Sequence, residues 1–406
     1  MHLINQKLTA TLLIAVASVC GRAIVPGQET TSFPWTGKIG PLSGFNTGAT
    51  CVGDHWLITA GHVVFGQTQM RFQLDDGRTY DSIAIFHHPT DDIALVEVAE
   101  TFPGWYDIYW STNQIGKTLE MVGYGVTGTF DGTRWRYSGE YGTKRRGRNR
   151  VATTQVVHFM GDPPINGDFM ICDFDGGGVD QLGEGGPLEN EATLGGLDSG
   201  SPSFISDGGI LKVAGVHSWV GSVTGGPQPP QYGSVFGDLR LSTYRSWYDS
   251  IVPAEVLPGT MSLFRGSVVS GNLASLFRSD DSRLVLRPGA VFSSSERPIQ
   301  LILEGVSPVT STTEMRFAFE GSASAATIEK RIELFNFTTG QYQVFNTSNS
   351  TTTDSVTEVV VPANPSQYIQ AGTRAVRARI SGRALTPQFQ YPWQLRIDRA
   401  VWNIKR

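Results

Sequence analysis

The chain has 406 residues, a formal net charge of −5 at pH 7, 47 glycines and 3 cysteines. This length allows two domains of ordinary size, each with its own core. Acidic and basic residues are interspersed, so the composition gives no reason to expect a nucleic-acid partner, and the one dense basic run, residues 144–150, is interpreted as an exposed loop.

The N-terminus has the pattern of an export signal. Lys7 precedes an apolar run, residues 8–19, which is too short to span a bilayer and typical of a signal-peptide core. Small residues precede two alternative cleavage sites, after Ala17 and after Ala23. We take residues 1–23 as the signal peptide and predict a secreted protein, extracellular or periplasmic, with no membrane association after export.

Residues 24–252 alternate short apolar runs with Gly, Pro, Asp and Asn, which predicts many short strands and turns. An exception is residues 242–248, where Tyr244, Trp247 and Tyr248 have the spacing of a short amphipathic helix. The apolar runs interpreted as strands include residues 56–58, 93–96, 119–122 and 213–216. Such a pattern favours an all-β domain, a closed barrel or a sandwich.

A second domain is predicted after a proline-rich linker, residues 253–260. Residues 261–406 alternate polar and apolar side chains more plainly and are predicted to form an antiparallel β-sandwich. Residues 331–337 and 342–345 read as a hairpin, and residues 346–355 as a polar loop. The acidic turn 278–282 could ligate calcium but is interpreted as a solvated turn, so neither domain is expected to hold a metal.

The cysteines predict neither a metal site nor a catalytic thiol. Cys20 lies in or beside the signal segment, which leaves Cys51 and Cys172 in the body of the chain. Both stand in apolar runs and are expected to be free, buried hydrophobic residues, although a pairing between them stays open in an exported protein.

Three short motifs supply the groups that nucleophilic catalysis needs. Thr59-Ala60-Gly61-His62 ends an apolar run, Asp92-Ile93-Ala94-Leu95 begins one, and Asp198-Ser199-Gly200-Ser201-Pro202 forms a small-residue turn. They provide, in chain order, a base, a carboxylate that can orient the base, and a hydroxyl nucleophile. Each motif alone also has a purely structural explanation, as a turn, a strand start or a glycine-rich loop.

Together these motifs resemble those of the trypsin-like (chymotrypsin-fold) serine peptidases, especially their exported bacterial members. The resemblance covers residues 24–250 and implies a two-barrel peptidase domain, followed here by an accessory β-sandwich. It implies that His62, Asp92 and Ser199 are catalytic, with the backbone N–H groups of Leu197 and Ser199 as the oxyanion hole. The proposed chemistry needs no cofactor.

Two positions depart from the family pattern. Leu197 stands where the family usually has glycine, and a Cβ resists backbone angles that glycine accepts, which puts the oxyanion hole in doubt. Ile24 begins a stretch that resembles the family's mature N-terminus, whose free amine pairs with the acid before the nucleophile. Cleavage after Ala23 would therefore allow an Ile24–Asp198 pair, whereas the plain alternative is that Ile24 only begins a strand.

The resemblance also implies a substrate pocket near Thr193, with Ser218, Trp219 and Val220 in its wall. Thr193 is not an acid, so cleavage after Lys or Arg is not expected. Cleavage after a small or medium uncharged residue is expected instead. The glycine-rich acidic insert at residues 173–192 could shape a subsite, but it is interpreted as a surface loop.

Two functions follow from these observations. The first is a secreted serine endopeptidase acting on protein or peptide substrates. The second is a catalytically inactive, peptidase-like binding or adhesion protein that acts through its C-terminal sandwich, whose expected ligand is a surface or a polysaccharide. The complete set of triad residues favours the first function, and Leu197 keeps the second open.

Overall fold

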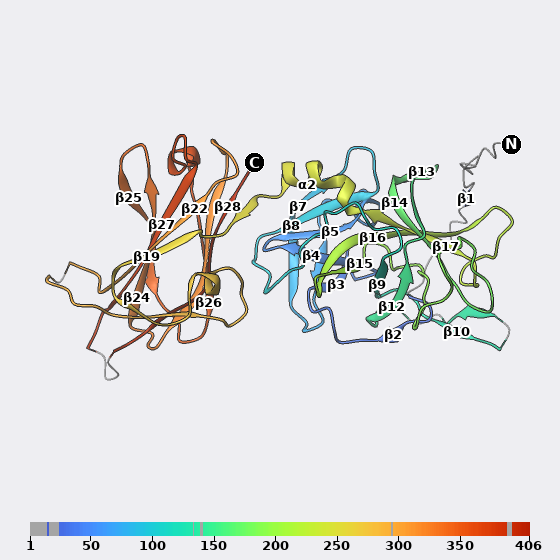
Figure 1. The fold of residues 1–406 in the computed structure, drawn as a ribbon, viewed down its shortest axis with the longest axis horizontal. Helices are drawn as coiled ribbons and strands as arrows, with labels where there is room; N and C mark the ends of the chain where they lie inside the picture. Colours follow the sequence, from blue (N-terminus) through green and yellow to red (C-terminus); the bar gives the residue numbers. More distant parts are fainter. Residues whose placement is uncertain (1–13, 16–23, 133, 139–140, 294, 388–391) are drawn as a thin grey trace, which may run out of the picture. The chain divides into compact units, whose positions relative to one another are not determined.

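The computed structural model describes residues 14–15, 24–132, 134–138, 141–293, 295–387 and 392–406 (Figure 1). Most of the predicted signal peptide, including Cys20, lies outside the described residues. The chain divides into two compact units, Met1–Trp247 and Tyr248–Arg406. Nearly all of the regular structure is strand, so the predicted all-β class is confirmed. No described helix is long and apolar enough to cross a membrane.

The first half of unit 1 is a closed six-stranded barrel. Its strands follow the order β3 (Thr36–Gly40), β4 (Thr47–Gly53), β5 (Trp56–Ala60), β8 (Ile93–Val98), β7 (Thr79–His87) and β6 (Arg71–Gln73). Every residue of β5 is buried, and its side chains contribute to a core that includes Leu57, Phe72 and Val96. The one-turn helix α1 (Gly61–Val64) follows β5 directly.

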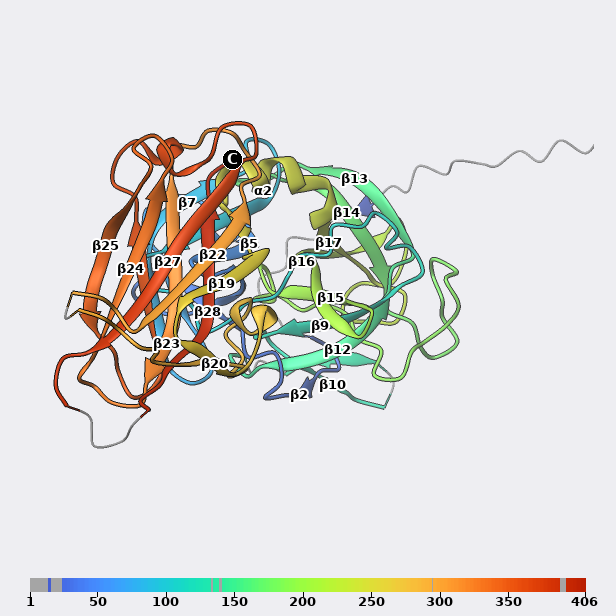
Figure 2. The same cartoon turned by 60° about the vertical axis from the view of Figure 1, so that its left-hand side comes forward.

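The second half of unit 1 is a nine-stranded antiparallel sheet, part of which is seen in Figure 2. Its order is β13 (Thr153–Phe159), β14 (Ile165–Asp173), β17 (Val235–Arg240), β16 (Ile210–Val223), β15 (Pro202–Asp207), β9 (Thr118–Gly123), β12 (Arg145–Arg150) and β2 (Gln28–Glu29), with β1 (Ile14–Ala15) paired to β16. A separate hairpin joins β10 (Gly128–Phe130) and β11 (Trp135–Tyr137).

Unit 2 contains two antiparallel sheets that share one apolar core. One sheet has the order β20 (Ser267–Ser270), β21 (Leu284–Arg287), β28 (Leu395–Ile404), β23 (Met315–Ala323) and β26 (Ser355–Val360), with β18 (Ala254–Val256) paired to β28. The other has the order β19 (Thr260–Arg265), β22 (Ile299–Val306), β27 (Ala375–Ala384), β24 (Ile328–Asn336) and β25 (Gln341–Asn349). The 3₁₀ turns η2 (Leu273–Leu276) and η3 (Pro365–Tyr368) lie between strands.

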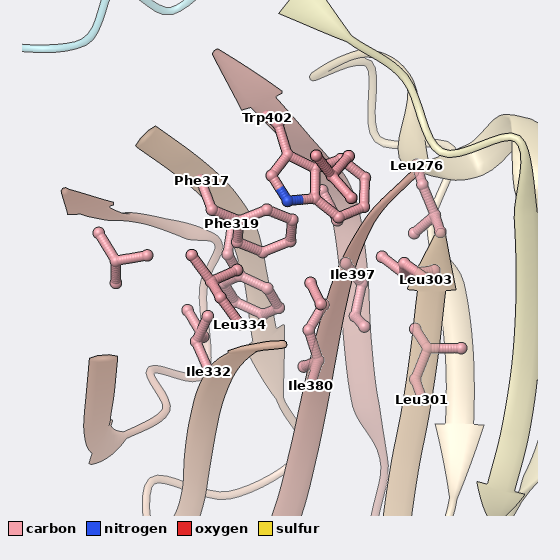
Figure 3. Close-up of a cluster of buried hydrophobic side chains, with 14 of the residues drawn as sticks. Leu276, Leu301, Leu303, Phe317, Phe319, Ile332, Leu334, Ile380, Ile397 and Trp402 are labelled. Atoms are coloured by element: carbon pink, nitrogen blue, oxygen red, sulfur yellow. The ribbon is translucent and has the colours of Figure 1, made fainter. Parts of the chain in front are cut away.

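The core of unit 2 explains its alternating sequence. Phe317 and Trp402 come from one sheet and Leu301 and Ile380 from the other, and Figure 3 shows them gathered in one cluster. In β22 buried residues alternate with more exposed ones along almost the whole strand. A strand with one buried face requires this period of two, so the pattern read in the sequence is the direct consequence of sheet-on-sheet packing.

Several local predictions can be compared with these elements. The predicted helix at 242–248 is present as η1 (Leu241–Tyr244) and α2 (Arg245–Ile251), and the predicted hairpin is β24–β25. Cys51 and Cys172 are both buried and free. The polar loop predicted at 346–355 is wrong at both ends, because β25 continues to Asn349 and β26 begins at Ser355. β25 is polar because it is the edge of its sheet, where few of its side chains are buried.

Candidate active site

The pairing register of β5 and β8 in the barrel brings His62 to Asp92. Strands β5 and β8 pair antiparallel with Ala60 opposite Ile93, so α1 begins beside the start of β8. Gly61 donates its N–H to the carbonyl oxygen of Asp92 at 2.9 Å. A Cβ on Gly61 would lie 3.1 Å from the Asp92 backbone, so glycine allows the two segments to approach this closely.

Asp92 holds the imidazole of His62 through several contacts. His62 Nδ1 lies 2.8 Å from Oδ2 and 3.0 Å from Oδ1 of Asp92, and the His62 backbone N–H donates to Oδ1 at 2.7 Å. Ser218 on β16 donates its hydroxyl to Asp92 Oδ2 at 2.6 Å. The Asp92 side chain is 1% exposed and that of His62 is 21% exposed, so the carboxylate is enclosed while the ring remains accessible.

The electrostatics of this pair favour a histidine that binds a proton readily. Burial alone lowers the pKa of His62, but the charge of Asp92 and its hydrogen bond to the ring outweigh burial, so the pKa is raised above its ordinary value. A carboxylate at Nδ1 leaves Nε2 as the nitrogen that can accept a proton from another group. The pair can therefore serve as a general base.

The turn that carries Ser199 rests on the same strands. The Ser199 carbonyl accepts the N–H of Gly48 on β4 at 3.2 Å. Gly200 has a φ of +80°, and a Cβ there would lie 2.1 Å from Thr59 Oγ1 on β5. Because β5 ends at Ala60, just before α1, this contact fixes the Ser199 turn next to the segment that carries His62. Ser199 is partly exposed.

Leu197 adopts the backbone conformation that glycine would favour. Its φ is +67°, in the left-handed region that costs a residue with a Cβ about 1 kcal/mol or more. The leucine that replaces the family's usual glycine is therefore accommodated through backbone strain at Leu197 itself.

Asp198 is fully buried next to Ile24. Its Oδ1 accepts the N–H of Gly125 at 3.2 Å and its Oδ2 that of Gly195 at 3.0 Å. A Cβ on Gly123 would meet Asp198 Oδ1 at 1.9 Å and Ile24 Cγ1 at 3.3 Å, so both residues line the same space. Burial raises the pKa of Asp198 to about 7, against the opposing effects of His217 and the two N–H groups.

The four residues expected at a substrate pocket are distributed over two segments. Ser218, Trp219 and Val220 are consecutive on β16, where Ser218 bonds Asp92 and Trp219 packs between Phe159 and Phe169. Thr193 is buried and its backbone forms a bridge with Val25. These contacts give Ser218 a role at Asp92 that the sequence did not indicate.

A pocket of about 320 Å³ lies directly against His62. Its lining includes Phe65, His87, His88, Asp91, Pro163 and Pro164 as well as His62 and Asp92. Apart from His62 and Asp92, the sequence analysis did not select these residues. In the sequence, the adjacent residues His87 and His88, shortly before Asp92, were the only local signal that could have indicated this pocket.

A second histidine–carboxylate pair lies entirely inside unit 1. His217 Nδ1 is 2.7 Å from Asp238 Oδ1, and both side chains are 0% exposed. Burial alone lowers the pKa of His217, but Asp238 outweighs it and the pKa is raised. The sequence analysis missed this pair, because the two residues stand on adjacent strands, β16 and β17, without a local motif.

The insert at residues 173–192 concentrates buried acids. Burial raises the pKa of Glu184 and of Asp175, and the neighbouring Asp173 raises both further. Burial also raises the pKa of Glu191 to about 8. The insert is exposed over most of residues 177–190, as expected of a surface loop, but several of its acids are buried.

The comparison with protein families agrees with this geometry. The family model Trypsin matches residues 24–247, which is more than half of the 406-residue chain. The chain belongs to the trypsin family, and the matched region is a serine-peptidase domain whose substrates are proteins or peptides. No curated protein matches the chain significantly.

Proposed function

We propose that the chain is a secreted serine endopeptidase with His62, Asp92 and Ser199 as its catalytic residues. The observation that carries the proposal is the His62–Asp92 pair, hydrogen-bonded at 2.8 Å within a trypsin-family domain and accessible on the histidine side. The nearby glycine turn of Ser199 supports it, because a base is of use only beside the hydroxyl that it activates.

The reaction needs only groups of this chain and water. Ser199 Oγ attacks the peptide carbonyl carbon while His62 Nε2 takes the hydroxyl proton, and Asp92 stabilises the imidazolium that forms. The N–H groups of Leu197 and Ser199 bind the oxyanion. His62 then gives the proton to the leaving amine, and an ester of Ser199 remains. Water attacks this ester by the same proton transfers and releases the new carboxyl group and free Ser199.

Cleavage after Ala23 is proposed to complete the site. In the uncleaved chain Asp198 is buried and its pKa is raised to about 7, which means that its charged form lacks full compensation. A free amine at Ile24, which lines the same space, would supply a positive charge. The ionised Asp198 would then fix the turn that precedes Ser199.

Substrate preference and the role of the second domain remain predictions. Thr193 carries no charge, which supports an uncharged, small or medium residue before the cleaved bond. The accessory domain, residues 261–406, is expected to bind a surface or a polysaccharide.

Labelling with a fluorophosphonate probe tests the catalytic proposal on the full chain beginning at Ile24. The probe forms a covalent bond with an activated serine Oγ and releases fluoride. We expect labelling of the parent chain and none of Ser199→Ala. Ser201→Ala is the matched control, because its hydroxyl lies in the same turn, is buried and has no hydrogen-bond partner among the described residues.

The control separates two outcomes. Labelling that survives in Ser201→Ala and disappears in Ser199→Ala supports the proposal. A folded chain that begins at Ile24 and is not labelled contradicts it and favours a binding protein that acts through residues 261–406. Mass spectrometry of the naturally processed protein tests the activation step, since a mature N-terminus at Ser18 is incompatible with an Ile24 amine.

A further inference from the structure

Three acids from the insert converge at one point. Asp173 is the last residue of β14, and Asp180 and Glu184 follow in the insert. One carboxylate oxygen of each lies within 4.8 Å of the others. Three negative charges at this separation repel one another strongly unless one of the acids takes up a proton or a positive charge lies between them.

Unpartnered buried oxygens point to a ligand at this position. Asp173 is 0% exposed, and its Oδ2 accepts the N–H groups of Gln181 and Leu182 at 2.6 and 3.0 Å. Its Oδ1 is buried without a hydrogen-bond partner, as is Oε2 of Glu184. Buried carboxylate oxygens are normally satisfied, so these two atoms need a partner when both groups are ionised, and a cation can supply it.

No basic side chain of the described residues forms an ion pair with these three acids. Arg150 lies alongside the insert, but it donates to the backbone carbonyl of Glu184 at 2.9 Å. Unit 2 provides a contrast, because two acids of its cluster Asp281, Asp354 and Asp398 form ion pairs with Arg283, namely Asp281 and Asp354. An arginine supplies the positive charge there, and nothing comparable supplies it in the insert.

We propose that Asp173, Asp180 and Glu184 bind a calcium ion. All the donors are carboxylate oxygens, which hard cations prefer, and the site offers neither the nitrogen nor the sulfur ligands that favour zinc. The insert is a glycine-rich loop rather than a rigid octahedral cage, which suits the variable coordination of Ca²⁺ better than the strict geometry of Mg²⁺. Backbone carbonyls and water can complete the coordination.

The ion would hold the insert in place. The two ends of the insert are already joined, because Asn149 Nδ2 donates to the carbonyl oxygens of Asp173 at 2.6 Å and Ala192 at 2.9 Å. An ion bound by Asp173, Asp180 and Glu184 would also connect the middle of the insert to the end of β14. Calcium is therefore expected to stabilise the segment that leads into Thr193 and the Ser199 turn.

The experiment measures binding and stability, so it does not depend on catalysis. The full chain beginning at Ile24 carries Ser199→Ala, which also prevents self-digestion, and is freed of metal with a chelator. Calorimetric titration with Ca²⁺ and thermal unfolding with and without Ca²⁺ are compared with the same measurements in Mg²⁺. Tb³⁺ is a second probe, since Trp135 and Tyr232 pack against Phe174 of the insert and can sensitise the emission of the ion.

Three variants decide the result. Asp180→Asn with Glu184→Gln removes two ligands without touching the buried Asp173 and is expected to weaken Ca²⁺ binding by about tenfold or more and abolish the thermal stabilisation. Glu189→Gln neutralises one acid at an exposed position of the insert and should bind like the parent. Asp281→Asn should also bind like the parent.

Each outcome either supports or overturns the assignment. Stoichiometric Ca²⁺ binding that is lost only in the double variant supports it. The assignment is overturned if Ca²⁺ does not stabilise the parent or if the double variant binds Ca²⁺ equally well. It is also overturned if Ca²⁺ binding is lost in Asp281→Asn instead. Failure of the fluorophosphonate test would leave this result unaffected, so the two proposals are tested separately.

Discussion

The two histidine–carboxylate pairs of unit 1 have nearly the same geometry and very different surroundings. His62 Nδ1 lies 2.8 Å from Asp92 and His217 Nδ1 lies 2.7 Å from Asp238, and the pKa of both histidines is raised. The His62 side chain is 21% exposed, whereas that of His217 is 0% exposed. A hydrogen-bonded histidine–carboxylate pair therefore does not by itself identify a catalytic site. The exposure of His62 and the neighbouring Ser199 turn distinguish the first pair, which we propose to be catalytic, from the second.

The largest expected difference between the pairs is in catalysis. Asp92→Asn should lower kcat by about 10⁴-fold, because an amide favours the wrong tautomer of His62. Asp238→Asn should leave kcat per active site unchanged and lower stability instead. Steady-state kinetics normalised to the concentration of folded protein measure this. An equal loss of kcat in both variants would contradict the distinction.

For the free energy of unfolding we expect the opposite: a change in the interior His217–Asp238 pair should cost more than a change in the His62–Asp92 pair. His217→Leu leaves the fully buried Asp238 without its cationic partner, which is expected to cost about 3–5 kcal/mol of unfolding free energy. His62→Leu should cost less, because Asp92 keeps the Ser218 hydroxyl and the backbone N–H at position 62. Urea unfolding of both variants in a Ser199→Ala background gives the comparison. A smaller loss for His217→Leu would show that the interior pair does not stabilise the fold.

The pH dependence of stability should reveal the buried groups around the second pair. The folded-state pKa of Asp198 is about 7, above its ordinary value of 3.8, so protonated Asp198 favours the folded state. Asp198 contributes a few kcal/mol to the free energy of unfolding, because each pH unit between its two pKa values is worth about 1.4 kcal/mol. This contribution is fully present below pH 4 and is lost as the pH rises through about 7. The raised pKa of His217 acts in the same direction, because its stabilisation is also lost as the pH rises.

Unfolding of the uncleaved Ser199→Ala chain across this pH range tests the prediction. Asp198→Asn should flatten the profile, and Glu100→Gln, an exposed acid, should leave its slope intact. A chain beginning at Ile24 should lose less stability as the pH rises, since its amine favours the ionised carboxylate. An identical slope in the Asp198→Asn variant would be evidence against a buried, protonated Asp198.

The smallest expected effect on stability concerns Leu197, in the Ser199 turn. Leu197→Gly removes the strain of a φ of +67° but increases the entropy of the unfolded chain, so the two terms nearly cancel to within about 1 kcal/mol. Leu194→Gly, at a buried position three residues earlier, should cost about 3 kcal/mol or more. Thermal unfolding and the rate of probe labelling measure both variants. A large loss of stability in Leu197→Gly would mean that the leucine side chain, rather than the backbone, holds the turn.

Local sequence was sufficient for the strand-rich architecture and for the three motif residues. His62 follows β5, Asp92 directly precedes β8, and Ser199 lies in the turn before β15. Glycines in two of these segments meet a backbone requirement: Gly61 allows the approach to Asp92, and Gly200 has a positive φ and lies against Thr59. These glycines lie against distant segments, but the requirement for a glycine falls on a single position of each motif, so the motif records it. Alternating burial in unit 2 was equally local and predicted its sheets.

Other features required the tertiary structure. Ser218 lies 126 residues from the Asp92 carboxylate that it bonds, and His217 meets Asp238 only through the register of β16 and β17. The acids of the insert also looked like parts of a solvated loop, because composition does not show that Asp173 is buried or that Asp180 and Glu184 converge on it. The sequence by itself determined which groups are available for chemistry and the local backbone that presents them. Burial and partner choice depend on contacts between distant segments, and only the folded chain decided them.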